Sequence, residues 1–142
     1  MKLGAILNAH AFMNVERAPE LWDVRTEDEA FIRLLGEMIA AGLGKGAPLG
    51  ELTLNASNVV VEEDPSEESR LPAPGDYVAI TVSGNSDFGP ENTWYPDIAP
   101  NGRGLLTRLH TELTVAEARY AYVRRAPPHG SFTVFYSRER VS

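Results

Sequence analysis

The segment from Thr26 to Ala41 constrains the fold most, because it carries the clearest helix signature in the chain. Thr26 stands three residues before Glu29 in the S/T-x-x-E pattern of a capping box, with acidic residues in the first turn. Apolar residues then recur at helical spacing, namely Phe31, Leu34, Leu35, Met38 and Ile39. The glycines of "GLGKG" end the pattern. The sequence therefore predicts a helix over Glu27–Ala41 whose apolar stripe packs on a core.

Strand patterns dominate the chain from Val59 onward. The strongest is "YVAITVS" (Tyr77–Ser83), and the valines of "VVVEE" (Val59–Glu63) favour a strand before it. We expect these two strands to pair antiparallel, joined by an acidic, proline-rich surface loop over Glu62–Gly75 that we predict to be mobile. "SFTVFY" (Ser131–Tyr136) predicts a final strand that follows the turn "APPHG".

The remaining elements have weaker patterns. Leu3–Ala9 resembles a short first strand, followed by an irregular segment through Trp22. Leu105–Leu113 has leucines on one side of a short helix. Thr114–Val123 is ambiguous between helix and strand, and its alternating Ala118, Tyr120 and Tyr122 lead us to predict a strand.

This order of elements predicts an α/β fold. We expect a two-layer α/β sandwich, with a mostly antiparallel sheet and helices on one face. A chain of 142 residues can bury most of its apolar surface as one unit, so residues 1–142 are expected to form a single domain.

Charge and composition limit the classes of partner. The formal net charge of −7 argues against nucleic acid, whose phosphates are bound mainly by clustered Lys and Arg. The apolar run Leu3–Leu7 is too short to cross a membrane or to form the core of a secretion signal, so no membrane partner is expected. The absence of cysteine agrees with a reducing compartment, and we expect a cytoplasmic protein.

The stretch "ELTLNASN" (Glu51–Asn58) allows two interpretations. As a helix it would place Glu51 and Asn55 on one face, a carboxylate beside an amide. As a strand it would point Leu52, Leu54 and Ala56 one way and Asn55 the other, with no chemistry implied.

Four segments stand in the order and roughly the spacing of the conserved boxes of one nucleotide-binding family. They are "ELTLNA" (Glu51–Ala56), "VAITVSGN" (Val78–Asn85), "GRGLL" (Gly102–Leu106) and "GSFTVFYS" (Gly130–Ser137). Over residues 51–137 the chain resembles the GHKL ATP-binding domain of histidine kinases and anti-sigma-factor kinases. The resemblance implies a degenerate, regulatory nucleotide-binding domain that takes ATP and magnesium as cofactors.

The resemblance also implies roles for individual residues. Glu51 would be the catalytic carboxylate and Asn55 the magnesium ligand. The phosphates would lie against the backbone of Gly102 and Gly104, before a helix, and Thr133 would lie near the adenine. The loop after the second box would contribute further contacts to the cofactor, from Asn85, Asp87 and Gly89.

The aspartate and glycines that bind the adenine in that family are missing at the matching positions of this chain. The family's D-x-G-x-G positions are occupied by Gly84, Ser86 and Phe88, so Asp87 and Gly89 can serve only if the loop holds extra residues. With three valines continuing an extended chain after Asn58, we predict that Glu51–Asn58 is a strand and that ATP hydrolysis is undetectable.

A non-catalytic binding protein is the alternative. The loop Asp87–Pro96 contains Phe88, Trp94 and Tyr95, and aromatic residues of this kind dominate interface energetics. We expect this loop to line the functional surface and to meet a protein partner with a basic surface. A small-molecule enzyme is a third hypothesis, with its acid or base among Asp87, Glu91 and Asp97. The three histidines lie far apart and do not favour a metal site.

Overall fold

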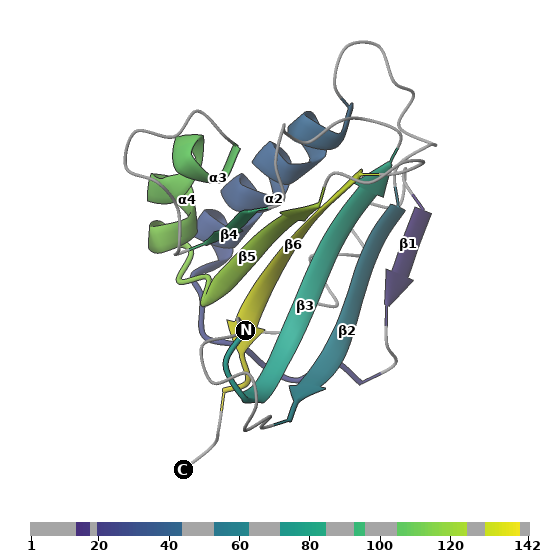
Figure 1. Ribbon diagram of the computed structural model, residues 1–142, viewed down its shortest axis with the longest axis vertical. Coiled ribbons are helices and arrows are strands. Elements are labelled where there is room, and N and C mark those ends of the chain that lie inside the picture. The colour runs from purple at the N-terminus through teal and green to yellow at the C-terminus, as the bar shows by residue number, and fades with distance from the viewer. Residues whose placement is uncertain are drawn as a thin grey trace.

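The computed structural model describes residues 14–17, 20–43, 53–62, 72–84, 93–95, 105–124 and 130–139. Their helices and strands follow one another along the chain as β1 (Asn14–Arg17), α2 (Asp28–Leu43), β2 (Thr53–Val61), β3 (Gly75–Gly84), β4 (Thr93–Tyr95), α3 (Leu105–Arg108), α4 (His110–Val115), β5 (Tyr120–Arg124) and β6 (Gly130–Ser137). The fold is therefore mixed α/β with strands in the majority (Figure 1).

The strands form one six-stranded sheet in the order β1-β2-β3-β6-β5-β4. Strands β2 to β6 pair antiparallel with their neighbours, while β1 pairs parallel with β2. The predicted antiparallel pairing of the valine-rich strand with Tyr77–Ser83 is confirmed by β2 and β3. The predicted final strand is confirmed by β6. The predicted first strand, Leu3–Ala9, lies outside the described residues.

Two edge strands were missed by the sequence analysis. Strand β1 lies in the stretch predicted to be irregular, and β4 lies in the predicted loop Asp87–Pro96. Both are very short, with four and three residues, so neither contains enough alternation to be recognised locally. Each is a strand because a longer neighbour, β2 or β5, offers it a free edge for hydrogen bonding.

Helix α2 confirms the predicted helix with its end displaced by two residues. Its predicted stripe is buried, since Phe31, Leu34, Leu35 and Met38 have at most 1% of their surface exposed. The Thr26 hydroxyl, predicted to cap this helix, donates to the carbonyl of Ala116 at 2.6 Å. That bond ties the start of α2 to the end of α4.

The predicted helix Leu105–Leu113 is divided into α3 and α4, and α4 continues to Val115. The predicted strand over Thr114–Val123 was therefore wrong in its first half, and β5 begins only at Tyr120. Helix α4 ends at Val115. Beyond it, Glu117 adopts a left-handed φ of 60°, and Ala118 N–H donates back to Leu113 O. This is a Schellman-type helix end formed without the usual glycine, so the sequence carried no glycine signal for it.

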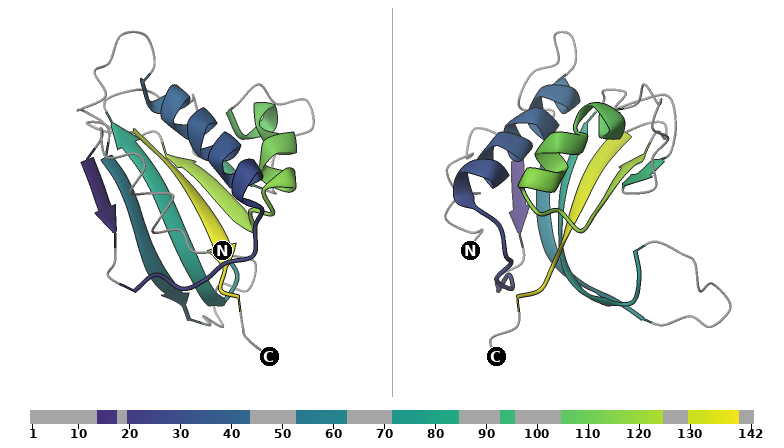
Figure 2. Two further views of the ribbon diagram at one scale, coloured as in Figure 1. Left: turned by 180° about the vertical axis from the view of Figure 1, so that it is seen from behind. Right: turned by 90° about the vertical axis from the view of Figure 1, so that its left-hand side faces the viewer.

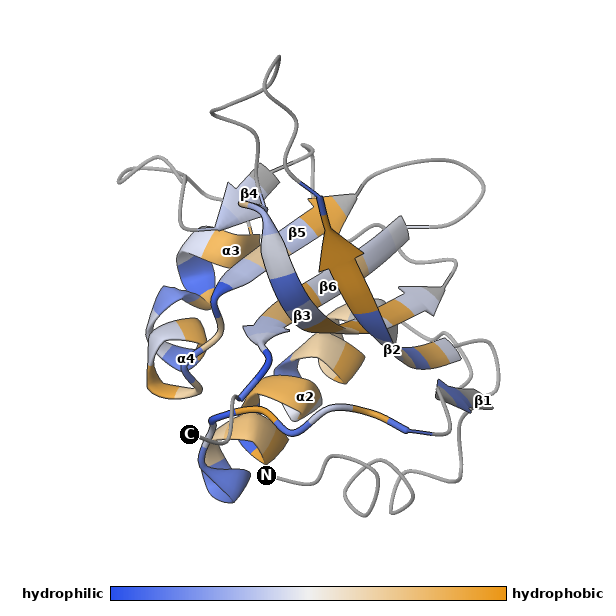
Figure 3. Ribbon diagram, turned by 90° about the horizontal axis from the view of Figure 1, so that it is seen from below, coloured by the Kyte–Doolittle hydropathy of each residue, from blue (hydrophilic) through white to orange (hydrophobic). Residues whose placement is uncertain are grey.

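The three helices lie on one side of the sheet (Figure 2). Their apolar side chains and one set of alternate strand residues form a continuous buried cluster, which includes Leu54, Ile80, Phe132 and Val134. Seen from below, the apolar part of α2 lies against the strands (Figure 3). Burial of these apolar side chains is the main stabilising contribution to the fold.

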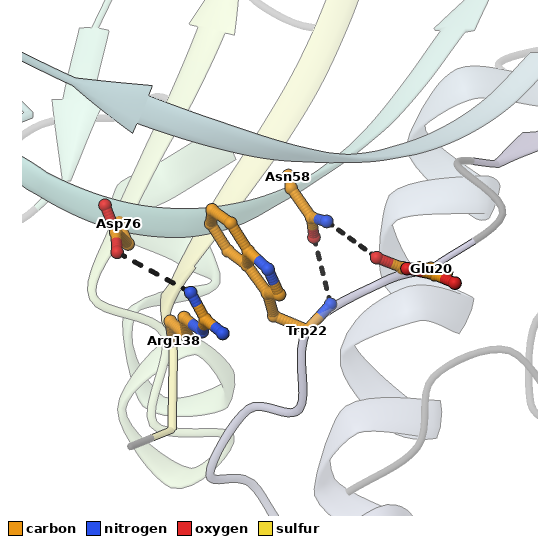
Figure 4. Close-up of polar contacts among 5 residues, drawn as sticks. All are labelled: Glu20, Trp22, Asn58, Asp76 and Arg138. Carbon is orange, nitrogen blue, oxygen red and sulfur yellow. Dashed lines mark hydrogen bonds and ion pairs between the residues drawn. The ribbon is translucent and has the colours of Figure 1, made fainter.

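A cluster of polar and aromatic contacts fixes the chain that leads into α2 (Figure 4). Trp22 N–H donates to Asn58 Oδ1 at 3.0 Å, and Asn58 Nδ2 donates to Glu20 O at 2.7 Å. The Arg138 guanidinium lies 4.4 Å from the Trp22 ring centroid and 3.9 Å from the Asp76 carboxylate. These contacts join the approach to α2 with strands β2 and β3 and the end of β6.

The hydroxyl of Tyr136 is the one buried side-chain polar atom in the described part of the chain that makes no hydrogen bond of good geometry. The Tyr136 ring packs edge-on against Phe31, with 5.9 Å between ring centroids. Burial raises the pKa of Tyr136 far above its usual value, and Thr26 opposes that shift only in part. The neutral phenol is therefore the form that the folded protein holds.

We predict that Tyr136→Phe removes a source of alkaline instability. Because the folded-state pKa is raised, the unfolded chain loses this proton first as the pH rises above about 10. The free energy of unfolding then falls by up to about 1.4 kcal/mol per pH unit from this group alone. Urea unfolding at pH 7 and pH 11 should show the variant equal to or slightly above wild type at pH 7, and clearly more stable at pH 11. The control is Phe31→Leu, which alters the same ring contact at a residue that does not titrate. This variant should lose the same free energy of unfolding, relative to wild type, at both pH values.

Candidate functional site

The face of the sheet opposite the helices is the candidate site. The sheet is strongly curved, and its concave side faces away from α2, α3 and α4 (Figure 2). We call this side the concave face. Strand alternation and pairing register assign it the following described side chains: Glu16, Thr53, Asn55, Ser57, Tyr77, Ala79, Thr81, Ser83, Trp94, Tyr120, Tyr122, Ser131, Thr133 and Phe135. None of them belongs to the core cluster under the helices.

One row of this face crosses all six strands. Successive Cα partners in neighbouring strands are Glu16, Asn55, Thr81, Thr133, Tyr122 and Trp94. The row is polar over β1, β2, β3 and β6 and aromatic over β5 and β4. A ligand that lies along it would therefore meet hydrogen-bonding groups at one end and rings at the other.

The polar part of the row is internally hydrogen bonded. The hydroxyls of Thr81 and Thr133 lie 2.8 Å apart, and either can donate to the other. Because such a pair uses only one of its two hydroxyl hydrogens, the other remains for a further acceptor. Asn55 Nδ2 makes a long contact of 3.5 Å to Glu16 Oε2. The pair of threonines is thus a suitable group for binding a carbonyl or hydroxyl oxygen.

The aromatic part of the concave face is built around Trp94. Its ring lies 4.5 Å from the Tyr122 ring and 5.8 Å from the Phe135 ring, with interplanar angles of 31° and 27°. Both partner rings are thus only moderately inclined to the Trp94 ring, and aromatic contacts of this kind are favourable beyond the area that they bury. All three side chains are only half-buried. The cluster therefore still presents apolar surface to an incoming ring.

Two further tyrosines extend this cluster toward the other end of the strands. Tyr77 packs edge-on against Tyr120 and Phe135, with centroids 5.8 and 6.1 Å apart. Its hydroxyl donates to Ala73 O at 2.6 Å, and burial, followed by Tyr120, raises the pKa of Tyr77. The Arg119 guanidinium lies 5.1 Å from the centre of the Tyr120 ring. Tyr77 and Tyr120 are buried within the concave face, so they pack against its other rings and expose little surface of their own.

The structure brings three of the predicted site residues, Asn55, Thr133 and Trp94, into one row. Asn55 and Thr133 lie in the same row, separated by Thr81. Asn55 lies on strand β2, so the helical interpretation of Glu51–Asn58 is wrong from Thr53 onward and the predicted strand is confirmed there. The side chain of Asn55 points to the concave face, between Leu54 and Ala56, which are buried under the helices.

The other predicted site residues are distributed differently. Trp94 lies on the concave face, whereas Tyr95, the next residue of β4, is buried on the helix side with its hydroxyl 3.1 Å from Thr114 Oγ1. The buried position of Tyr95 does not favour its predicted contact with a partner. The remaining predicted residues lie outside the described part of the chain: Glu51, Asn85, Asp87, Phe88, Gly89, Glu91, Asp97, Gly102 and Gly104.

The chain matches no protein-family model and no curated protein sequence.

Two further observations concern the described residues alone. In those ranges, no three His, Cys, Asp or Glu side chains come together as a metal site would need. None of the helices there has both the length and the apolar character of a membrane crossing.

Three residues of the candidate site on the concave face, Thr81, Tyr122 and Phe135, were not predicted from the sequence. Thr81, Tyr122 and Phe135 each occupy an outward position in a strand that was predicted, so alternation alone would have placed them opposite the core. Alternation gives the face of a residue but not its neighbours on other strands. Their proximity to Trp94 depends on the register of β4, β5 and β6.

Proposed function

We propose that this protein is a non-catalytic binding protein and that the concave face is its recognition surface. The observation that carries the proposal is the contact of the Tyr122 and Phe135 rings with Trp94, beside the hydroxyl pair of Thr81 and Thr133. Binding sites for small molecules are typically concave, largely apolar or aromatic, and furnished with a few polar groups that orient the ligand. The concave face combines these three properties.

The proposed architecture explains why this face is available. In a two-layer α/β sandwich the helices cover one face of the sheet and bury its apolar residues. The opposite face of an antiparallel sheet is normally polar and solvated. Half-exposed aromatic rings on that face depart from the usual pattern, and such departures favour a role in binding.

Nucleotide binding remains the alternative proposal, from the resemblance to GHKL domains, and it has weaker support. The magnesium ligand implied by that resemblance, Asn55, lies on a strand and contacts Glu16, whereas the resemblance places it on a helix. We therefore expect ATP and magnesium together to leave the melting temperature unchanged. A ligand at a hundred times its Kd would add about 2.7 kcal/mol of stability, so real binding would be easily detected. Magnesium-dependent stabilisation that disappears in Asn55→Ala would restore the nucleotide-binding alternative.

A dye titration tests the proposed binding face. Nile red, a neutral dye that fluoresces in apolar surroundings, should bind wild type with one site per chain, and Trp94→Ala should weaken that binding about tenfold or more. Ile32→Ser and Val115→Ser are matched controls, because they remove exposed apolar side chains from helices α2 and α4. Both controls should bind the dye as wild type does. Dye binding that is insensitive to Trp94 but lost in either control would contradict the proposal.

A further inference from the structure

We infer that the ligand of the concave face is a neutral, flat aromatic molecule of about two fused rings with a hydroxyl or carbonyl group at one end. This inference rests on the proposed function, because it assigns a chemical class to the occupant of the same face. Three features carry it, namely the geometry of the rings, the position of the polar pair and the distribution of charge.

The rings favour a flat aromatic occupant over a saturated one. Tyr122 and Phe135 are inclined to the Trp94 ring by 31° and 27°, and all three side chains are only half-buried. A further ring can join such a cluster in an offset-stacked or edge-on arrangement, which is favourable beyond the apolar area that it buries. A saturated molecule of the same size gains only the free energy of burying its apolar area.

The polar pair sets the length and the polar end of the ligand. Thr133 is the direct cross-strand partner of Tyr122, which in turn is the partner of Trp94. Neighbouring strands lie about 4.8 Å apart, so the row places Thr133 roughly 10 Å from Trp94. A molecule of two fused rings that packs against Trp94 would therefore bring a substituent at its far end to Thr133. The unshared hydrogen of the Thr81–Thr133 pair can then be donated to an oxygen there.

The charge of the face excludes strongly ionic ligands. Its centre consists of Asn55, Thr81 and Thr133 together with the rings, and the carboxylate of Glu16 lies at the outer edge, on β1. The Arg119 guanidinium lies at the opposite end of the face, beside Tyr120, so neither described charge lies at the centre. An ionic group placed over the centre would lose its hydration away from both, which is costly. The net charge of −7 acts further against an anion. A neutral molecule meets neither penalty.

Calorimetric titration with three bicyclic probes tests the inference on the full chain. The probes are 2-naphthol, trans-2-decalol, which is its saturated counterpart, and naphthalene-2-sulfonate, which carries a charge. We expect 2-naphthol to bind with one site and to displace Nile red. The decalol should bind about fivefold more weakly, because it lacks the ring interactions. The sulfonate should bind at least about tenfold more weakly, because its charge is desolvated without a partner.

Matched variants test the polar contact. Thr133→Val keeps the shape of the side chain but removes its hydroxyl. It should weaken the binding of 2-naphthol about fivefold and leave the binding of naphthalene unchanged. Thr111→Val, at an exposed position of helix α4 on the other side of the sheet, should change neither. If Thr133→Val weakens the binding of naphthalene and 2-naphthol equally, the inferred hydrogen bond between Thr133 and the ligand oxygen is wrong.

The remaining outcomes separate the inference from the proposed function. If the decalol or the sulfonate binds as tightly as 2-naphthol, the ligand class is overturned while dye binding at Trp94 still supports a binding face. If a lysine-rich peptide displaces the dye and 2-naphthol does not, the occupant is a basic protein and the inference fails. If neither Nile red nor any of the three probes binds, both the inference and the proposed function fail.

Discussion

Ala56→Asp should abolish stable folding, whereas the neighbouring Ser57→Asp should be tolerated. Ala56 is 1% exposed and lies on strand β2 among the apolar side chains under α2, so an aspartate there would be buried without a partner. Leaving a buried charge uncompensated costs about 3–5 kcal/mol, a large fraction of the stability of a small domain. Ser57 points to the concave face and is half-buried at the surface, so its aspartate keeps contact with water.

Circular dichroism and urea unfolding of the two variants provide the measurement. The two variants together also test whether "ELTLNASN" is a strand, because adjacent side chains point to opposite faces in a strand. Similar losses of stability in both variants would contradict the alternation of β2 and with it the definition of the concave face.

The second large effect is expected at Phe132, where Phe132→Ala should destabilise the protein by about 3–5 kcal/mol. Phe132 is fully buried in the core cluster, and removing its ring leaves a cavity that the surrounding sheet and helices cannot readily fill. Phe135 is a matched control, since it is the same residue type on the same strand but points to the concave face. Phe135→Ala removes a half-buried ring and should cost about 1 kcal/mol.

Chemical unfolding at equilibrium measures both free energies under identical conditions. Phe135→Ala should also weaken Nile red binding, whereas a smaller side chain at Phe132 should act on stability alone. If the two alanine variants lose stability equally, the concave face contains a second core as important as the first, and the face is structural. If Phe132→Ala costs less than about 1 kcal/mol, the assigned core is wrong.

The elements that were predicted correctly are those whose local pattern is long. Helix α2 has a full amphipathic stripe and an acidic first turn, and strands β3 and β6 each carry several alternating pairs of inward and outward residues. In β2 the valines decided the prediction, because a branched side chain favours the extended backbone whatever it later contacts. For these segments the sequence determined the structure through nearest neighbours along the chain.

Tertiary structure decided the elements with short or ambiguous patterns. Strands β1 and β4 exist as edge strands that pair with longer strands. The segment before Tyr120 ends helix α4, because Ala118 N–H donates to Leu113 O and Ala116 O accepts from the Thr26 hydroxyl. These partners are distant in sequence or depend on backbone conformation. Local sequence patterns therefore could not predict these hydrogen-bond partners.

The candidate site shows the same division. The sequence by itself identified Trp94, Asn55 and Thr133 as notable, but it assigned them to different hypotheses, a partner surface for the first and a nucleotide site for the other two. Strand alternation fixed the face on which each side chain lies. Only the pairing registers of five strands, which form hydrogen bonds between residues far apart in the chain, brought these three residues into one row with Thr81 and Tyr122.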